Sequence, residues 1–251
     1  MRSTRVLGPY IRRTLARFGF DISREDSLLL EPEFQTIFAT CRAFSMASRE
    51  RLYAVFQAVQ HINENKIPGD LVECGVWRGG ASMVAALTQI SQGDASRRIW
   101  LYDTFAGMTT PGVRDVHRWA RKNAWHKWAR SERDQYNNWC HASLDEVKEN
   151  LFSTEYPRDR IEFVKGDVRE TLTSGGPDRI AVLRLDTDWY DSTKIELEAL
   201  YPRLSRGGVL ILDDYGVWSG ARQAVDEYFK QHDIKLLLQR TDYTGRMGLK
   251  L

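Results

Sequence analysis

From residue 70 onward the sequence alternates between short apolar runs and segments with helical periodicity. Each apolar run is rich in β-branched or aliphatic residues and ends in Gly or Asp, which is typical of a buried strand. We expect such strands over 71–74, 98–102, 160–164, 180–185 and 209–212. Helical patterns lie between most of them, over 81–90, 143–151, 192–204 and 221–231. This alternation predicts an α/β fold in which helices cover both faces of a doubly wound, mostly parallel sheet.

The two ends of this pattern predict how the chain is organised. Late apolar segments over 234–239 and 246–250 are separated by a turn-like stretch and resemble a hairpin, so an antiparallel strand should join the sheet edge. Residues 25–66 look mainly helical and lead into a Pro-Gly turn before the first core strand. We therefore expect an N-terminal helical extension over 1–66 and one α/β domain over 67–251.

The composition is that of an ordinary globular protein and excludes several classes. Hydrophobic residues make up 42% and charged residues 28% of the 251 residues, and a chain this long buries a core without disulfides. Its three cysteines have no metal-ligand spacing, which argues against a disulfide framework or a zinc module and favours a reducing cytoplasm. No apolar run approaches the ~20 residues of a membrane helix. A net charge of +2 is too small for a nucleic-acid clamp.

The start of the chain carries charge of one sign. Residues 1–20 contain five arginines and no acid, and apolar residues recur among them at near-helical spacing. We favour a helix that packs on the body or on a second subunit. Peripheral contact with an anionic membrane through a basic amphipathic helix, and a transit peptide, are the alternatives. No apolar segment followed by a small-residue cleavage site is present, so we do not expect secretion.

One long segment interrupts the strand–helix alternation. Between Gly107 and about Asn150 there is no strand signal, and 114–133 carries seven basic residues and two acids. Half of the eight tryptophans lie in or near it, namely Trp119, Trp125, Trp128 and Trp139. An excursion this long predicts a helical lid or binding insertion over 107–150. It would suit stacking on nucleic acid, a sugar face, a phosphorylated or nucleotide-linked substrate, a subunit contact, or simple packing onto the body.

A glycine-rich turn follows the first expected strand. It reads Glu73-Cys74-Gly75-Val76-Trp77-Arg78-Gly79-Gly80. Glycines here let a ligand approach the backbone closely, at the carboxyl end of the sheet where α/β proteins bind ligands. The spacing is not G-x-G-x-x-G, so a dinucleotide pyrophosphate cradle is disfavoured. A carboxylate in such a turn suits a hydroxyl or a cation better than a phosphate, and a purely structural turn is the alternative.

Single acids follow the second and third expected strands. Asp103, with Thr104 after it, lies where an acid usually hydrogen-bonds ribose hydroxyls, about 20–30 residues past a glycine turn. Asp167 follows Gly166, where it would accept from an adenine amino group. A helix N-cap that pairs with Glu170 in a capping box is an equal alternative for Asp167.

The most specific pattern is a pair of acidic clusters after the fourth and fifth expected strands. Asp186 and Asp188 follow the fourth strand, and Asp213-Asp214 follows the fifth. If these strands are neighbours, their ends lie about 5 Å apart and the carboxylates converge. Crowded carboxylates raise one another's pKa unless a cation neutralises them, and an oxygen-only ligand set selects a hard ion such as Mg²⁺. Helix caps and turns would explain single acids but not the convergence.

These motifs together resemble a known family. The segments 73–80 (ECGVWRGG), 103–107 (DTFAG), 186–193 (DTDWYDST) and 213–215 (DDY) look like those of the macrocin O-methyltransferase family, in order and with similar spacing, over about residues 45–230. The resemblance implies a class I methyltransferase fold, which is Rossmann-like with a seven-stranded sheet, and a homodimer. It also implies S-adenosylmethionine as the methyl donor, and Mg²⁺ or another divalent cation. The family methylates sugar hydroxyls on natural products.

The resemblance also assigns roles. Glu73 and Gly75 would contact the methionine end of the donor, and Asp188 would be the catalytic general base. The expected cofactor-binding residues are Glu73, Gly75, Val76, Trp77, Gly79, Ser82, Asp103, Thr104, Asp167 and Asp186. The expected metal ligands are Asp186, Asp213 and Asp214. The sequence departs from the family at 166–168, where Gly-Asp-Val replaces Gly-Trp-Phe near adenine. Its Trp-rich insertion also differs from the macrolide branch.

The expected function is therefore methylation of a sugar hydroxyl that has a neighbouring hydroxyl. A catechol-type O-methyltransferase that acts on a phenol is the first alternative, because it shares the fold, the donor and the metal chemistry. A nucleic-acid binding module is the alternative of another class, but it leaves the four aspartates of the acidic clusters without a role. A hydrolase is disfavoured because no Gly-x-Ser-x-Gly turn is present.

Overall fold

The computed structural model of the protein describes residues 31–173 and 175–251. The Arg-rich segment 1–20 lies outside the described residues. Two compact units divide the chain, Met1–Gln35 and Thr36–Leu251. Residues 31–35 belong to the first unit, and the sheet with the helices that cover it belongs to the second. No helix among the described residues has the length and apolarity that spanning a membrane would need.

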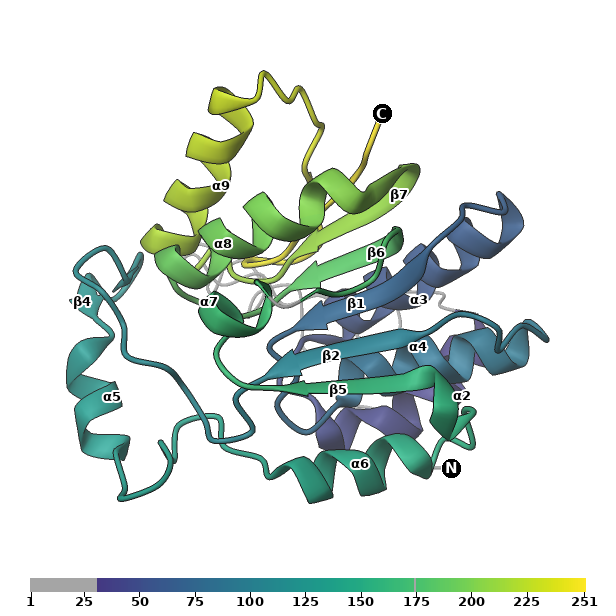
Figure 1. Ribbon diagram of the computed structural model, residues 1–251, viewed down its shortest axis with the longest axis horizontal. Helices are drawn as coiled ribbons and strands as arrows, with labels where there is room; N and C mark the ends of the chain where they lie inside the picture. The colour runs from purple at the N-terminus through teal and green to yellow at the C-terminus, as the bar shows by residue number, and fades with distance from the viewer. Residues whose placement is uncertain (1–30, 174) are drawn as a thin grey trace, which may run out of the picture. The chain divides into compact units, whose positions relative to one another are not determined.

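A seven-stranded sheet forms the centre of the second unit (Figure 1). Its strands are β1 (Asp70–Cys74), β2 (Ile99–Asp103), β5 (Ile161–Lys165), β6 (Ile180–Leu185), β7 (Leu204–Leu212), β8 (Gln239–Arg240) and β9 (Arg246–Leu249). They lie in the order β5-β2-β1-β6-β7-β9-β8. The first five are parallel to their neighbours, whereas β9 runs antiparallel to β7 and β8. The expected mostly parallel, seven-stranded sheet with an antiparallel edge is confirmed.

Helices cover both faces of the sheet, as the alternation predicts. One layer contains α3 (Arg49–Glu64), α4 (Gly80–Ser91) and α6 (Leu144–Phe152), and the other contains α7 (Val168–Thr171), α8 (Tyr190–Leu200) and α9 (Ser219–Gln231). Figure 1 shows the two layers on opposite sides of the strands. Helix α2 (Pro32–Cys41) precedes them, and short 3₁₀ turns occupy Arg42–Phe44, Arg158–Arg160 and Tyr201–Arg203.

Helix α3 belongs to the same compact unit as the sheet. Leu52, Val55, Phe56, Val59 and Ile62 are buried along it, at the spacing of one helical face. Ser48 begins the helix, and its hydroxyl oxygen accepts from the backbone N–H of Arg51. Helix α3 and the sheet thus lie in one compact unit, and a division of the chain at 66/67 stays a prediction.

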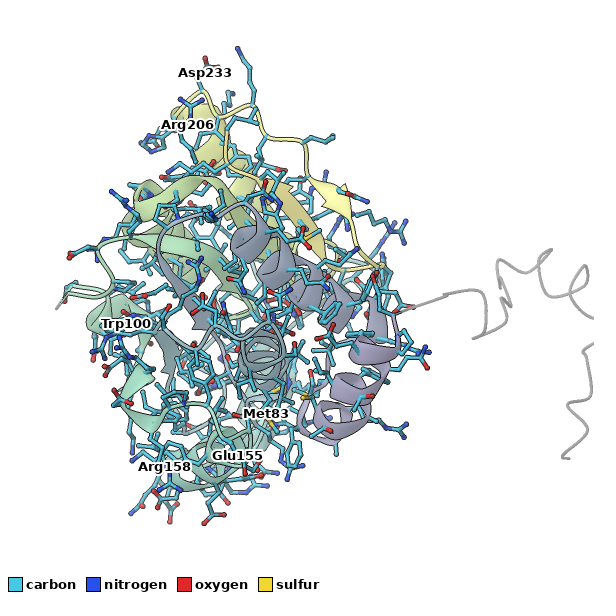
Figure 2. All side chains as sticks on the ribbon, turned by 90° about the vertical axis from the view of Figure 1, so that its right-hand side faces the viewer. Met83, Trp100, Glu155, Arg158, Arg206 and Asp233 are labelled. Atoms are coloured by element: carbon cyan, nitrogen blue, oxygen red, sulfur yellow. The ribbon has the colours of Figure 1, made fainter. Side chains whose placement is uncertain are left out.

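The core lies between the central strands and the α8–α9 layer. Every residue of β6 is buried, because a central parallel strand is covered on both faces. Leu183, Leu210 and Leu212 pack with Leu197 of α8 and Val225 of α9. Figure 2 shows Met83 of α4 in the interior on the other side of the sheet, where it is fully buried. This rigid centre fixes where the strand ends lie.

Three local expectations differ from the structure. The predicted helix over 192–204 ends at Leu200, because Pro202 follows and cannot continue an α-helix. The first strand of the predicted hairpin is reduced to the two residues of β8, and Leu237 before it is 86% exposed. The insertion contains two short antiparallel strands, β3 (Val116–His117) and β4 (Lys122–Asn123), before helix α5 (Trp125–Ser131).

Candidate active site

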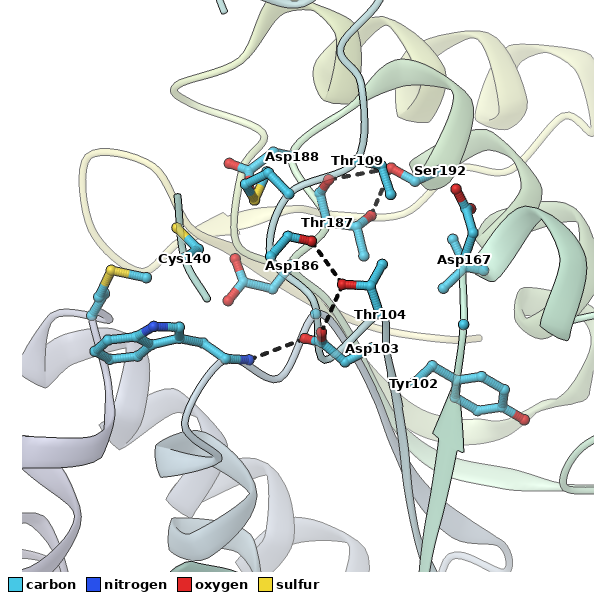
Figure 3. Close-up of a pocket in the computed structure, with 17 residues that line it drawn as sticks. Tyr102, Asp103, Thr104, Thr109, Cys140, Asp167, Asp186, Thr187, Asp188 and Ser192 are labelled. Atoms are coloured by element: carbon cyan, nitrogen blue, oxygen red, sulfur yellow. Dashed lines mark hydrogen bonds between the residues drawn. The ribbon is translucent and has the colours of Figure 1, made fainter. Parts of the chain in front are cut away.

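Two adjoining cavities lie at the carboxyl ends of the parallel strands, where open α/β sheets bind ligands. The first cavity has a volume of about 660 Å³ and is lined by the loops after β1, β2, β5 and β6 (Figure 3). The second cavity has a volume of about 750 Å³ and is lined by the chain before α3, the loops after β1, β6 and β7, and the insertion. The two cavities share the side chains of Met46, Trp77, Cys140, Asp186 and Asp188.

Gly75 brings the loop after β1 against the loop after β6. Its φ of +84° is left-handed, and a Cβ atom there would lie 1.9 Å from the carbonyl oxygen of Asp186. Only glycine fits both the conformation and the close approach. The glycine of the ECG motif is therefore required where the first cavity meets the acidic cluster.

Asp103 joins the loops that follow β1 and β2. Its Oδ2 accepts from the backbone N–H groups of Val76, at 2.7 Å, and Trp77, at 3.1 Å, and its Oδ1 accepts from that of Phe105 at 2.7 Å. Burial raises the pKa of Asp103, and the backbone hydrogen bonds oppose that rise. Asp103 and Thr104 both line the first cavity, as Figure 3 shows.

Asp167 also lines the first cavity and is drawn at the right of Figure 3. It is also the N-cap of α7, since its Oδ1 accepts from the backbone N–H of Arg169 at 2.9 Å. Burial opposes ionisation, but the hydrogen bonds and charge of Arg169 outweigh it and lower the pKa of Asp167. Asp167 is thus an N-cap and also part of the cavity wall, and its contact with adenine stays a prediction.

Other residues expected at the cofactor lie beside the first cavity. Glu73 and Val76 line the second cavity instead. Ser82 is buried and donates to Glu73, which also accepts from Arg184. Gly79 is the N-cap of α4. The expected residues that do line the first cavity are Gly75, Trp77, Asp103, Thr104, Asp167 and Asp186.

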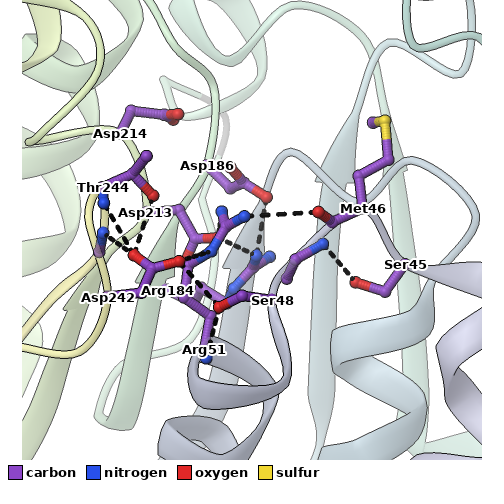
Figure 4. A network of polar contacts seen from close by, with 12 residues as sticks. Ser45, Met46, Ser48, Arg51, Arg184, Asp186, Asp213, Asp214, Asp242 and Thr244 are labelled. Atoms are coloured by element: carbon purple, nitrogen blue, oxygen red, sulfur yellow. Dashed lines mark hydrogen bonds and ion pairs between the residues drawn. The ribbon is translucent and has the colours of Figure 1, made fainter. Parts of the chain in front are cut away.

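The acidic clusters converge, because β6 and β7 are neighbours with Leu185 opposite Leu212. Two arginines lie among the carboxylates (Figure 4). Arg184 donates from Nη2 to Asp186 Oδ2 at 2.7 Å and to Asp213 Oδ2 at 2.6 Å. Arg51 of α3 donates from Nη1 to the same Asp213 oxygen at 2.7 Å. The two guanidinium groups balance part of the negative charge of the aspartates. From the sequence, only a metal ion was expected to do so.

The carboxylate oxygens are the ligand type that a hard cation prefers, but their present arrangement is not that of a metal site. Asp213 Oδ1 is buried without a hydrogen-bond partner, so one oxygen of the cluster is free to coordinate. Burial raises the pKa of Asp186 and of Asp214 well above the usual value, which a nearby cation would reverse. Within 31–173 and 175–251, however, no three His, Cys, Asp or Glu side chains are arranged to hold a metal ion. Binding would require these side chains to turn.

Asp188 lies where the two cavities meet. Its backbone has a φ of +68°, uncommon for a residue with a side chain, and its N–H donates to Asp214 Oδ2 at 3.0 Å. Burial, followed by the charge of Asp186, raises the pKa of Asp188 to about 7, although hydrogen bonds from Asp214 and Trp218 oppose the rise. Near neutral pH this carboxyl group therefore exists in both forms, as proton transfer requires.

Trp139 of the insertion belongs to an aromatic cluster beside Asp188, together with Trp189 after β6 and Trp218 after β7. Trp189 packs against Trp139 and Trp218, with ring centroids 5.6 and 5.1 Å apart. Trp139 lines the second cavity, and Lys127 Nζ lies 3.9 Å from the centre of its ring. The packing role considered for the tryptophans is thus confirmed at Trp139.

A buried carboxylate fastens the insertion to the body. Asp115, only 1% exposed, accepts from the backbone N–H of Tyr190 at 2.9 Å, at the first turn of α8. Its other oxygen accepts from the backbone N–H of Gly112 at 2.6 Å. Asp115 therefore ties the insertion to the start of α8.

Comparison with known proteins assigns the chain to a family. The family model of macrocin-O-methyltransferase (TylF) matches residues 39–247. The chain belongs to the macrocin O-methyltransferase family. It is therefore an O-methyltransferase, as the motifs implied.

Relatives of this methyltransferase act on natural products. It is 36% identical over 203 residues to the 8-demethyl-8-(2,3-dimethoxy-alpha-L-rhamnosyl)-tetracenomycin-C 4'-O-methyltransferase of Streptomyces olivaceus, which covers 81% of this chain and 74% of the relative. It is 32% identical over 205 residues to the mycinamicin III 3''-O-methyltransferase of Micromonospora griseorubida, with 81% and 77% covered. Among solved structures, the O-methyltransferase NovP aligns with a TM-score of 0.72 at 32% identity, over 82% of each chain.

Sequence reasoning missed two side chains that contact the acidic cluster, Arg184 and Arg51. Arg184 is the one charged residue in the apolar run of β6, and a buried charge beside an acidic cluster was a usable signal. Arg51 had no such signal, because it reaches Asp213 across 162 positions of sequence. Its position depends on how α3 packs.

Proposed function

We propose that this methyltransferase transfers a methyl group from S-adenosylmethionine to a sugar hydroxyl of a small natural product, with Mg²⁺ or another divalent cation as cofactor. The observation that carries the proposal is the meeting of two cavities at Asp186 and Asp188. Methyl transfer requires the donor and the acceptor to meet. Two cavities that share Asp186 and Asp188 would let a donor in one reach an acceptor in the other.

The first cavity suits the donor. Asp103 would accept from the ribose hydroxyls and Asp167 from the adenine amino group. Gly75 and Trp77 would lie against the methionine end, on the side of the second cavity.

The second cavity suits the acceptor, and Asp188 would act as its base. An alcohol is a weak nucleophile because it is scarcely ionised at neutral pH. The acceptor oxygen would bond to the donor methyl carbon as the carbon–sulfur bond breaks, and the hydroxyl proton would pass to an Asp188 carboxylate oxygen. Positioning both reactants contributes about 7–11 kcal/mol at best. The products would be a methyl ether and S-adenosylhomocysteine.

A divalent cation would be held by Asp186, Asp213 and Asp214. Their oxygen-only donor set matches Mg²⁺, and the unpartnered Asp213 Oδ1 supports the assignment. When bound, the cation would stabilise negative charge on the acceptor oxygen. Arg51 and Arg184 would keep the remaining carboxylate oxygens in position, through the bonds described above.

A sugar acceptor is favoured over a catechol by the relatives. The tetracenomycin relative is named for the 4' position of a rhamnosyl group, and the mycinamicin relative for a 3'' position. The expectations of a homodimer, of a cytoplasmic location and of contact between residues 1–20 and a membrane stay predictions.

A paired substrate panel tests the proposal. The full-length enzyme is incubated with S-adenosylmethionine, Mg²⁺ and either rhamnosides or catechols, and methylated products are detected by mass spectrometry. We expect methyl ethers of the rhamnosides only. Methylated catechols without methylated sugars would establish the phenolic alternative. Calorimetric titration with S-adenosylhomocysteine tests the donor cavity separately.

A further inference from the structure

Two large aromatic side chains are exposed beside the second cavity. Tyr243 lines that cavity and is 51% exposed, and Trp119 of the insertion is 58% exposed. Their ring centroids are 5.1 Å apart and their planes are inclined by 38°. The two residues come from distant parts of the sequence, so the fold, rather than chain continuity, brings these rings together. We call this pair the aromatic platform.

The platform is held in place from behind. The His117 ring lies edge-on to Trp119, with centroids 6.0 Å apart, and edge-on to the buried Trp218, at 5.3 Å. The backbone N–H of Arg118 donates to the carbonyl oxygen of Val217 at 2.9 Å, and His117 forms a β-bridge with Trp218. Trp119 is thus an exposed ring on a fixed support. Exposed, rigid aromatic rings lose little conformational entropy when they bind a ligand.

We propose that the aromatic platform binds a planar aromatic group attached to the sugar that is methylated. The inference rests on the proposed function, because it takes the second cavity as the sugar site. Tyr243 makes the platform continuous with that cavity, so a group attached to the sugar would emerge against it. Flat aromatic groups pack on such rings at centroid distances of 4.5–7 Å. An aromatic aglycone and the base of a nucleotide-linked sugar share this chemistry.

Three glycosides separate these sources. Methyl rhamnoside lacks an aromatic group, 2-naphthyl rhamnoside carries an aglycone analogue, and dTDP-rhamnose carries a base. KM and kcat are measured for each with the unaltered enzyme and with W119A. The control is W125A, because Trp125 is 50% exposed on α5 and lies outside the platform.

We expect W119A to raise the KM for one aromatic glycoside by roughly tenfold, as loss of a stacking partner does, and to leave kcat and the KM for methyl rhamnoside unchanged. W119F should recover part of the affinity, and W125A should change nothing. An effect confined to naphthyl rhamnoside would identify an aglycone, and one confined to dTDP-rhamnose a base. Unchanged KM values for both aromatic glycosides, or an equal rise in KM for all three substrates, would contradict the proposal that the platform binds an aromatic group.

Binding without turnover keeps this inference separate from the proposed function. The quenching of tryptophan fluorescence by 2-naphthyl rhamnoside is measured in the presence of S-adenosylhomocysteine. Saturable quenching that W119A abolishes, with no methylation of any sugar, would support the platform and reject the proposed acceptor. Methylation of sugars with no such quenching, and with the same KM values for W119A as for the unaltered enzyme, would support the proposed acceptor and reject the platform.

Discussion

Arg184 donates to the Asp213 carboxylate across 2.6 Å, and both side chains are almost completely buried. Arg184 lies near the end of β6 and Asp213 directly after β7, so the pair joins two neighbouring strands at their carboxyl ends. Arg184 also pairs with Glu73 and Asp186. One guanidinium group therefore pairs with carboxylates from three strand ends, and several consequences can be measured.

Removing this cation should destabilise the fold. R184A would leave Glu73, Asp186 and Asp213 as buried acids without their main counter-charge, so we expect the free energy of unfolding to fall by about 3–5 kcal/mol in urea denaturation. The matched control is R222A, because Arg222 forms an exposed pair with Asp226 on α9, which should be worth less than about 0.5 kcal/mol. A similar small loss for both variants would show that the carboxylates are satisfied in another way.

Loss of the Asp188 carboxylate should affect chemistry and spare donor binding. D188N keeps the size of the side chain but removes the proton acceptor, so kcat should fall by about 10²- to 10⁴-fold. The affinity for S-adenosylhomocysteine, measured by calorimetry, should not change. D191N is the control, since Asp191 is exposed on the first turn of α8. Full turnover in D188N would assign the base to another group.

Chelation should abolish activity if the acidic cluster holds a divalent cation. We expect EDTA to stop methyl transfer and excess Mg²⁺ to restore it. D213N and D214N should need more Mg²⁺ for half-maximal activity, because each loses a charged oxygen donor. D233N is the control, because Asp233 is exposed after the end of α9, and it should respond to Mg²⁺ like the unaltered enzyme. Activity that persists after exhaustive chelation would remove the metal from the proposal.

The Cys140 thiol should react slowly and with a characteristic pH dependence. Burial, and then the charge of Asp188, raises the pKa of Cys140 to about 12. The thiolate is the reactive form, so its population and the alkylation rate by iodoacetamide should rise about tenfold per pH unit through pH 10, without a plateau. S-adenosylhomocysteine should protect Cys140, which lines the first cavity. Glutathione serves as the reference thiol. A plateau near pH 9 would mean an exposed, ordinary cysteine.

Releasing Asp115 should loosen the insertion. D115A removes the acceptor for the Tyr190 N–H at the start of α8, and we expect a loss of about 1 kcal/mol, the usual value of a lost cap. Limited proteolysis should then cut within 107–143 more quickly than in the unaltered protein. D115N retains an accepting oxygen and should resist cleavage. Equal cleavage rates in all three proteins would show that other contacts hold the segment.

The sequence predicted the parts of the fold that depend on local pattern. The continuous apolar run at 180–185 could only be a covered strand or a helix segment, and its length and β-branched neighbours favoured the strand. Once β6 and β7 were neighbours, the convergence of Asp186 with Asp213 followed from geometry. The ECG motif predicted a turn that needs glycine at Gly75, but the close approach expected there was that of a ligand, whereas the structure places the loop after β6 against it.

Other features depend on long-range packing or on elements too short to show a period. Arg51 reaches the acidic cluster only because α3 crosses the sheet beside β6 and β7. The strands β3 and β4 have two residues each, so no alternation could reveal them. Tyr243 and Trp119 meet through the folding of two separate loops, which no local pattern encodes.

The insertion belongs to both cavities at once. Gly107, Met108 and Thr109 line the first cavity, Trp139 lines the second, and Cys140 lines both. A change of sequence in this segment therefore reaches the two pockets together. Chimaeras that exchange 107–143 between relatives should shift the affinity for S-adenosylhomocysteine as well as the choice of acceptor.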